Sequence, residues 1–327
     1  MTHKIFSINE ATFKSQALGV FRYQYFNNEV YRNFTDALQI NVDEVDTMIA
    51  IPFLPVSFFK SHSVQTGNFL PEVIFESSGS TQNIQSRHLV NSISWYRKSF
   101  MKTFELFYGS PDEYCIIGLL PSYLERRNSS LIMMVDELIR ASGHPESGFY
   151  LDEHEKLYSV LPELEKKGQK IILIGVTFGL LDFAEKYQLS LRHTTIMETG
   201  GMKGRREELT RQQVHDFLKE RLGVTEIHSE YGMTELLSQA YSKGNGIFYC
   251  PPWMKVLLRE EDDPLKVYAE SYTSNSSGVI NVIDLANIDS CAFIATDDVG
   301  KLHAGGCFEV LGRMDNSDIR GCSLMVV

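Results

Sequence analysis

Four hydroxyl side chains and a glycine cluster directly behind a short apolar run. Val73–Phe75 leads into a segment that contains Ser77, Ser78, Gly79, Ser80 and Thr81. Phosphate oxygens require many short donors, and such a segment offers hydroxyls and backbone N–H groups around a glycine that lacks a Cβ. The pattern predicts a strand that leads into a phosphate-binding turn. Such clusters are also typical of plain surface loops, so this segment alone leaves both interpretations open.

Three further blocks follow downstream in a set order. They are Tyr231-Gly232-Met233-Thr234-Glu235, Thr296-Asp297-Asp298-Val299-Gly300 and Gly312-Arg313-Met314-Asp315. Together with the serine-rich segment, their order and spacing resemble the adenylate-forming superfamily, which includes the acyl- and aryl-CoA synthetases. In that superfamily, blocks of this kind surround ATP. The resemblance implies the activation of a carboxylic acid by ATP and Mg²⁺.

The resemblance assigns the phosphates and the metal to two blocks. Thr234 would hydrogen-bond the α-phosphate, and Glu235 would hold Mg²⁺, a hard cation that prefers oxygen ligands. Tyr231 and Gly232 belong to the same block. A carboxylate at a helix N-terminus is the alternative role for Glu235. The β- and γ-phosphates would be cradled by Ser77, Ser78, Gly79, Ser80 and Thr81.

The nucleoside would lie against the remaining blocks. Asp298 would accept hydrogen bonds from both ribose hydroxyls, and Arg313 would place a permanent positive charge beside the ribose and phosphate. Gly200 and Gly201 resemble the paired glycines that pass close to the adenine. Each residue also has a structural alternative: Asp298 as a turn residue, Arg313 as a surface cation, and the glycine pair as a tight turn without a ligand.

The sequence departs from the superfamily in two respects. It ends at residue 327, 14 residues after Arg313, where most adenylate-forming enzymes continue into a mobile lid that carries a catalytic lysine. We therefore expect a body without that lid. The phosphate segment also lacks the lysine that the commoner form of the loop carries, so a lysine contact with phosphate must come from elsewhere or be absent.

The end of the chain indicates a narrower family. Residues 312–327 resemble the acyl-protein synthetases of bacterial bioluminescence, the LuxE family, whose members carry an acyl-accepting cysteine near the C-terminus. By this resemblance, Cys322 takes the acyl group from acyl-AMP as a thioester and delivers it to a partner acyl reductase or acyl carrier. Arg320, two residues away, would favour the thiolate. A small buried hydrophobe is the alternative role for Cys322.

Three functions fit these features. The first is ATP-dependent activation of a carboxylic acid, which we expect to be a fatty acid, followed by transfer of the acyl group to a protein cysteine. The second is a CoA ligase of the phenylacetate type whose lid is supplied by another polypeptide. The third is a catalytically silent nucleotide-binding subunit. A Ser-His-Asp hydrolase is disfavoured because the sequence has no GxSxG motif.

Composition excludes several other classes. Hydrophobic residues make up 43% and charged residues 22% of the 327 residues, as in ordinary globular proteins. The net charge of −11 opposes binding to nucleic acid. With no apolar stretch long enough for a signal peptide or a membrane span, we expect a cytoplasmic protein. The five cysteines form no CxxC pair, which predicts reduced thiols and no zinc site.

The pattern of elements predicts an α/β body over residues 1–245. Aromatic-rich helices occupy the first 70 residues, and one amphipathic helix is expected over about 85–108. Buried strands are expected at 114–120, at 170–175 and through Ile196, with a helix at 131–141 between them, so the sheet should be mostly parallel. The segment 176–183 would lie between a strand and a helix, and its apolar residues favour an apolar acid.

Short strands separated by turns follow from about residue 246. They predict a small antiparallel or barrel-like subdomain over 246–327. Lys203, Arg205 and Arg206 form a basic group that either contacts phosphate or opens a solvated helix. His215 and His303 lie near no recognisable nucleophile, and we interpret them as structural.

Overall fold

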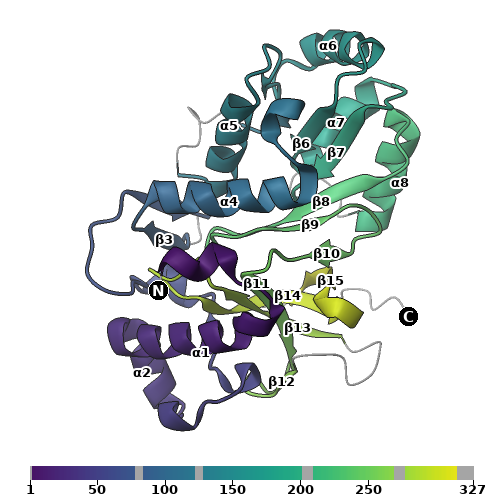
Figure 1. Ribbon diagram of the computed structural model, residues 1–327. Helices are drawn as coiled ribbons and strands as arrows, with labels where there is room; N and C mark the ends of the chain where they lie inside the picture. Colours follow the sequence, from purple (N-terminus) through teal and green to yellow (C-terminus); the bar gives the residue numbers. More distant parts are fainter. Residues whose placement is uncertain (1, 78–83, 122–127, 201–208, 269–276, 315–327) are drawn as a thin grey trace.

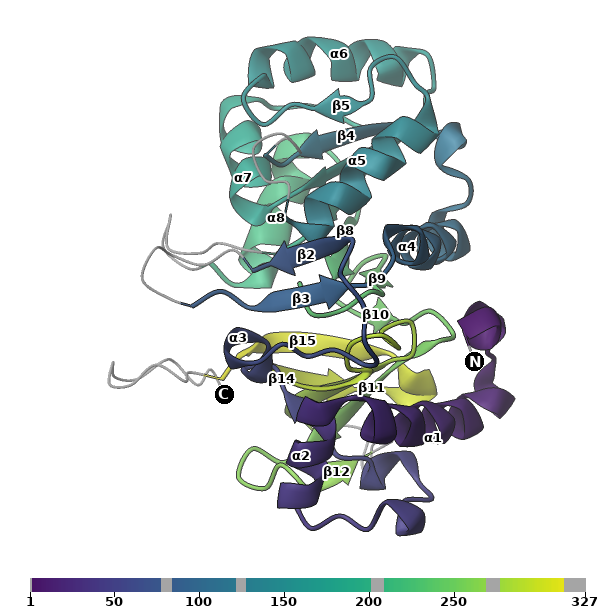
Figure 2. The ribbon, with the colours of Figure 1, turned by 90° about the vertical axis from the view of Figure 1, so that its left-hand side faces the viewer.

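One large mixed sheet organises the protein, as the ribbons in Figure 1 and Figure 2 show. The computed structural model describes residues 2–77, 84–121, 128–200, 209–268 and 277–314, with no side-chain description for residues 2–4. In these residues the strand order is β12-β11-β13-β14-β15-β10-β9-β8-β7-β6-β4-β5, and β1 pairs with β14. The strands are β1 (Leu54–Pro55), β4 (Cys115–Leu119), β5 (Gly148–Phe149), β6 (Ile171–Gly175), β7 (Thr194–Glu198), β8 (Ile227–Tyr231), β9 (Ala240–Ser242), β10 (Phe248–Tyr249), β11 (Met254–Arg259), β12 (Val267–Tyr268), β13 (Ser277–Asp284), β14 (Phe293–Leu302) and β15 (Phe308–Arg313).

Helices and one separate hairpin complete the fold. The hairpin pairs β2 (Val73–Glu76) with β3 (Arg87–Val90) in antiparallel register. The α-helices are α1 (Glu10–Asn27), α2 (Glu29–Ala37), α3 (Phe58–Ser61), α4 (Ile93–Tyr108), α5 (Ser130–Ser142), α6 (His154–Lys166), α7 (Thr177–Lys186) and α8 (Arg211–Leu222). Short 3₁₀ turns are η1 (Thr2–Ser7), η2 (Val42–Glu44), η3 (Met48–Ala50), η4 (Pro111–Glu113) and η5 (Ala304–Gly306).

The parallel part of the sheet is buried on both faces. Strands β5, β4, β6, β7 and β8 run parallel to one another. Successive strand side chains point to opposite faces: Ile116 belongs to the core cluster that includes residues of α4 and α5, whereas Ile117 belongs to the cluster of α6, α7 and α8. The predicted α/β class is confirmed, as are the strands at β4, β6 and β7 and the helix at α5.

The helix predicted over residues 85–108 is wrong at its beginning. Arg87–Val90 form β3, and α4 starts at Ile93 behind the N-cap Ser92, whose hydroxyl accepts from the backbone N–H of Trp95. His88 and Val90 are buried while Arg87 is exposed, which is the two-residue alternation of a strand. The apolar residue at 89 also suits a helix pattern, so the periodicity extended the predicted helix too far.

The segment 176–183 was expected as a connection between a strand and a helix, and this prediction is also wrong. Helix α7 starts at Thr177, immediately after β6. Leu180, Leu181 and Phe183 are buried in the core beneath the sheet. The apolar content of this segment therefore reflects packing of a helix against a parallel sheet.

Strands β11, β13, β14 and β15 are antiparallel, as the predicted short strands required, and the N-terminal helices cover them. Strand β1 lies parallel to β14.

The fully buried Gln24 of α1 donates from Nε2 to three carbonyls and accepts from the backbone N–H of Ala292 at 2.9 Å. The three carbonyls are those of Asn287 (3.1 Å), Ile288 (2.9 Å) and Ser290 (3.2 Å). The start of the chain is thereby joined to residues 287–292. The division at residue 245/246 stays a prediction.

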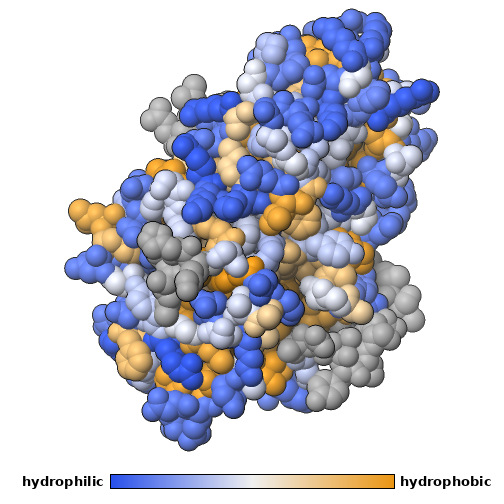
Figure 3. Space-filling model, in the orientation of Figure 1, coloured by the Kyte–Doolittle hydropathy of each residue, from blue (hydrophilic) through white to orange (hydrophobic). Residues whose placement is uncertain are grey.

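The surface is mostly hydrophilic on the face shown in Figure 3, with apolar residues in separate groups. Among the described helices, none combines the length and the apolar character that crossing a membrane requires.

Candidate active site

The hairpin β2–β3 holds the base of the predicted phosphate loop. Ser77 follows β2, and its backbone N–H donates to the carbonyl of Ser86 at 3.1 Å. In return, the N–H of Ser86 donates to Oγ of Ser77 at 3.0 Å. A hydroxyl that accepts in this way can also donate its own proton. Ser78, Gly79, Ser80 and Thr81 lie outside the described residues, so their role stays a prediction.

The YGMTE block, residues 231–235, forms a tight turn at the end of β8. This turn lies beside the base of the predicted phosphate loop. Glu235 is 4% exposed, and its carboxyl group lies beside the side chain of Ser86. Burial raises the pKa of Glu235, against the opposing effect of the Ser86 hydroxyl. Ser86 thus contacts both Ser77 and Glu235, which brings the first and second sequence blocks together.

The second block also meets the third and the fourth. The Tyr231 hydroxyl donates to Oδ2 of Asp298 at 2.8 Å, and Nε of Arg313 donates to Oδ1 of the same carboxylate at 2.9 Å. Asp298 and Arg313 are direct neighbours across β14 and β15. Asp298 is buried, whereas Arg313 is largely exposed. Each carboxylate oxygen can accept a further bond, so the arrangement fits the predicted contact with ribose.

Replacing Tyr231 with phenylalanine tests this cluster. Tyr231→Phe removes a donor from a buried carboxylate, and we expect the free energy of unfolding to fall by about 2 kcal/mol. The matched control is Tyr25→Phe, which removes a tyrosine–aspartate bond of the same 2.8 Å length between Tyr25 and Asp36 at an exposed site. The control should change stability by less than about 0.5 kcal/mol. Equal effects of both variants in denaturant unfolding would contradict the assigned cluster.

The predicted adenine turn begins at a left-handed glycine. Gly200 has φ +65°, and its N–H donates to Oε1 of Glu198 at 3.0 Å. Glu198 also accepts from the hydroxyl of Thr177 at the start of α7, and its Oε2 lies 3.8 Å from Nε2 of His215. Burial acts to raise the pKa of Glu198, but these partners outweigh it and the net shift is downward. Glu198 is a support for the turn that sequence reasoning missed; Gly201 lies outside the described residues.

Gly232 lies in the turn after β8, against the side chain of Glu230. A Cβ at this position would meet Oε1 of Glu230, so the end of that side chain would have to shift to admit any other residue. Burial, together with the charge of Glu198, raises the pKa of Glu230 to about 8.

Two buried polar residues, Asp284 and Asn287, form hydrogen bonds with residues 235–238 at the end of the YGMTE turn. They were not predicted from the sequence. Asp284 accepts from the backbone N–H groups of Leu237 (2.8 Å) and Ser238 (2.9 Å), and Oδ1 accepts from the Ser238 hydroxyl at 2.6 Å. Asn287 donates to the carbonyl of Glu235 at 2.7 Å. The available signal was a pair of polar residues, Asp284 at the end of the apolar strand β13 and Asn287 three residues later.

The residues present suit a magnesium ion bound together with a triphosphate. Among the described residues, no three His, Cys, Asp or Glu side chains are grouped to hold a metal by themselves. Mg²⁺ is commonly held by one or two carboxylates together with substrate phosphates. The buried Glu235 beside the phosphate-loop base is such a carboxylate, and a cation there would favour its ionised form.

Comparison with known proteins identifies the family. The model of the family "Acyl-protein synthetase, LuxE" matches residues 6–327. The chain belongs to the LuxE acyl-protein synthetase family. One relative of this LuxE-family chain is the long-chain-fatty-acid–luciferin-component ligase of Vibrio harveyi. It is 23% identical over 328 residues, which cover 94% of this chain and 85% of the relative.

Solved structures show the fold of the LuxE-family chain. ATP-bound MatB from Rhodopseudomonas palustris aligns with a TM-score of 0.54 at 15% identity, over 75% of this chain and 49% of MatB. An ATP-bound chimera, RpMatB-BxBclM B3, aligns with a TM-score of 0.53 at 16% identity, over 76% of this chain and 49% of the chimera. The LuxE-family chain thus shares the fold of these solved structures over about three quarters of its own length and spans about half of theirs.

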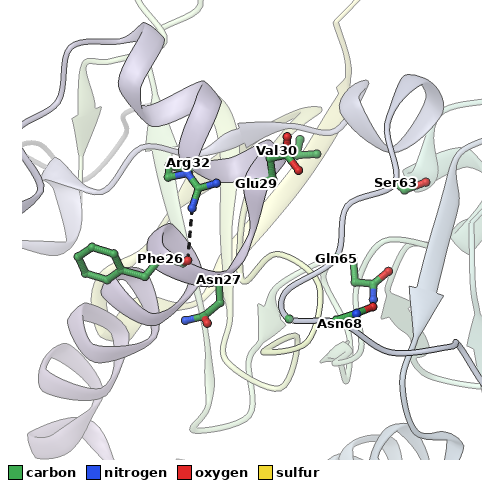
Figure 4. A pocket seen from close by; sticks show the side chains of 9 residues that line it. Phe26, Asn27, Glu29, Val30, Arg32, Ser63, Gln65 and Asn68 are labelled. Atoms are coloured by element: carbon green, nitrogen blue, oxygen red, sulfur yellow. Dashed lines mark hydrogen bonds between the residues drawn. The ribbon is translucent and has the colours of Figure 1, made fainter.

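A surface depression lies between α1, α2 and the segment 63–68 (Figure 4). Arg32 donates across one side of it to the carbonyl of Phe26 at 3.4 Å. None of the residues predicted for the nucleotide site lines this depression.

Proposed function

We propose that the protein activates a carboxylic acid, of the long-chain fatty class, with ATP and Mg²⁺ and transfers the acyl group to a protein cysteine. Family membership over residues 6–327 supports an acyl-protein synthetase. The observation that carries the proposal is the contact among sequence blocks far apart in the chain: Tyr231 and Arg313 both bond to Asp298, while Ser86 contacts Ser77 and Glu235.

The proposed reaction has two steps. In the first, a carboxylate oxygen of the acid attacks the α-phosphorus of ATP, the bond from that phosphorus to the bridging β-phosphate oxygen breaks, and pyrophosphate leaves. Glu235 and the hydroxyls of the phosphate loop hold the metal-bound triphosphate in line for this displacement. In the second step, a thiolate attacks the acyl carbonyl carbon, the C–O bond to the phosphate breaks, and AMP leaves with a thioester formed.

Cys322 is the proposed acceptor of the acyl group. It lies outside the described residues, so the proposal rests on its place near the C-terminus and on the state of the other cysteines. Cys115, Cys291 and Cys307 are buried, and Cys250 is half-buried. Burial raises the pKa of Cys115, Cys250 and Cys291, which disfavours the nucleophilic thiolate.

An acyl reductase or acyl carrier protein is the proposed recipient of the thioester. The acidic net charge of −11 argues against nucleic acid as a partner. A thioester retains enough reactivity to pass its acyl group to a second protein, so the acceptor cysteine would serve as a relay.

Intact mass spectrometry with an assay for pyrophosphate tests the proposal. The protein is incubated with ATP, Mg²⁺ and a panel of fatty and aromatic acids. We expect pyrophosphate release and an ATP-dependent mass increase of one acyl group that hydroxylamine removes. Pyrophosphate release without an adduct, but with acyl-CoA formed when CoA is added, would indicate a CoA ligase instead. ATP binding in calorimetry without pyrophosphate from any acid would indicate a non-catalytic subunit.

A further inference from the structure

A buried histidine connects the phosphate-loop hairpin with the YGMTE turn. His88 lies on β3, directly opposite Phe75 of β2, and has no exposed surface. Its Nδ1 lies 2.8 Å from the carbonyl oxygen of Thr234, and its Nε2 lies 3.0 Å from Oδ1 of Asn287. The edge of the Phe59 ring packs near the imidazole, with the ring centres 5.9 Å apart. The histidine therefore reaches the turn directly and also through Asn287.

The orientation of Asn287 is determined by its other partners. Nδ2 donates to the carbonyl of Glu235 at 2.7 Å and to the carbonyl of Cys291 at 2.9 Å. A reversed amide would place Oδ1 against two carbonyl oxygens, so Oδ1 faces His88. Both ring nitrogens of His88 consequently face acceptor atoms, and a neutral imidazole donates to one of them, whereas a protonated imidazole donates to both.

The contacts of His88 connect the hairpin that carries Ser77 with the turn that carries Thr234 and Glu235. The proposed reaction requires these two elements to keep a fixed relative position. Ser77 lies two residues after Phe75, the strand partner of His88, and begins the phosphate loop. The carbonyls of Thr234 and Glu235 belong to the residues that are proposed to contact the α-phosphate and the metal. The two ring nitrogens of a histidine can contact both the Thr234 carbonyl and Oδ1 of Asn287. A short amide or a hydroxyl at this position would reach only one of these two partners.

We propose that His88 is a positioning residue for adenylation, which holds the Thr234–Glu235 turn against the hairpin β2–β3 that carries Ser77. It touches neither substrate in this role and acts through the backbone of the turn and through Asn287. The proposal rests on the proposed function. Its distinctive consequence is that loss of His88 impairs mainly the step that uses the triphosphate and its metal, because acyl-AMP keeps only the α-phosphate contact of Thr234.

The test uses the full-length protein with His88→Phe and His88→Gln. Phenylalanine keeps a ring of similar size but removes both nitrogens, and glutamine keeps one donor. The matched control is Asn91→Ala. Asn91 follows β3 and donates to Asp289 at 3.0 Å, so it joins the end of this strand to the segment 287–289 without reaching residues 234–235. Adenylation is measured as the acid-dependent exchange of pyrophosphate into ATP, and acyl transfer is measured from synthetic acyl-AMP by intact mass spectrometry.

We expect the kcat of exchange to fall about 10- to 100-fold in His88→Phe and less in His88→Gln, while the KM for ATP changes less than kcat. Transfer from acyl-AMP should stay within about twofold of wild type in both, and Asn91→Ala should match wild type in both steps. An equal loss in both steps, or an exchange rate in His88→Gln equal to that of the control, would overturn the proposal. If His88→Phe fails to fold, His88→Gln alone decides. Absence of exchange in the wild type would instead overturn the proposed function.

Discussion

Glu235→Gln should lower the rate of acyl-adenylate formation by about 100-fold, the scale of losing one preorganised electrostatic contact in a transition state. The carboxyl group is buried beside Ser86 at the base of the phosphate loop. Glutamine keeps its size and one oxygen but removes the negative charge that would hold Mg²⁺. The measurement is the exchange of pyrophosphate into ATP at saturating acid.

Dependence on pH gives a second readout for Glu235. Because burial raises the pKa of its carboxyl group, the proton must leave before the metal can bind. The affinity of the wild type for Mg·ATP should therefore increase as the pH rises through that pKa, and this increase should be missing in Glu235→Gln. The control is Glu163→Gln, which removes an exposed carboxylate that pairs with Lys166 on α6. Wild-type exchange rates in Glu235→Gln would refute its role as the metal ligand.

Cys322→Ser should abolish the stable acyl-protein adduct while leaving pyrophosphate exchange within about twofold of the wild type. The hydroxyl of serine is a far weaker nucleophile than a thiolate near neutral pH, whereas the adenylation step does not involve the thiol. Intact mass spectrometry after incubation with ATP, Mg²⁺ and the acid measures the adduct, and hydroxylamine sensitivity identifies it as a thioester.

Cys307→Ser is the control for the cysteine experiment. Its thiol is buried, and Sγ donates to the carbonyl of Ala304 at 3.5 Å, so it should have no access to acyl-AMP. We expect this variant to form the full adduct. An adduct that persists in Cys322→Ser and disappears in Cys307→Ser would move the acceptor to residue 307.

The elements that were predicted correctly are those whose sequence patterns involve residues close together in the chain. Apolar runs such as 115–119 and 171–175 identify buried parallel strands, and α5 ends where Gly143 takes the left-handed conformation at φ +62°. The resemblance of their blocks assigned both Asp298 and Arg313 to the ribose, and the structure places these two residues on neighbouring strands. These features depend on residues close in sequence or on motif order.

The missed features depend on partners that are distant in sequence. His88 was assigned to a helix because residues around it also match a helical period, and only its contacts with Thr234 and Asn287 explain why it lies in a strand. Glu198 gave no signal either, because its partner Thr177 lies 21 residues earlier, across a helix start. Burial of polar side chains is decided by such partners, and single-sequence periodicity does not contain them.

The bonds from Gln24 to residues 287–292 have a consequence during synthesis of the chain. Asn287 supports the carbonyl of Glu235, and Gln24 in turn bonds to the backbone of Asn287. A ribosome makes Gln24 long before its partners, which emerge more than 260 residues later. The Thr234–Glu235 turn can therefore reach its final support only after residues 287–292 have been made, so this part of the fold is completed late in synthesis.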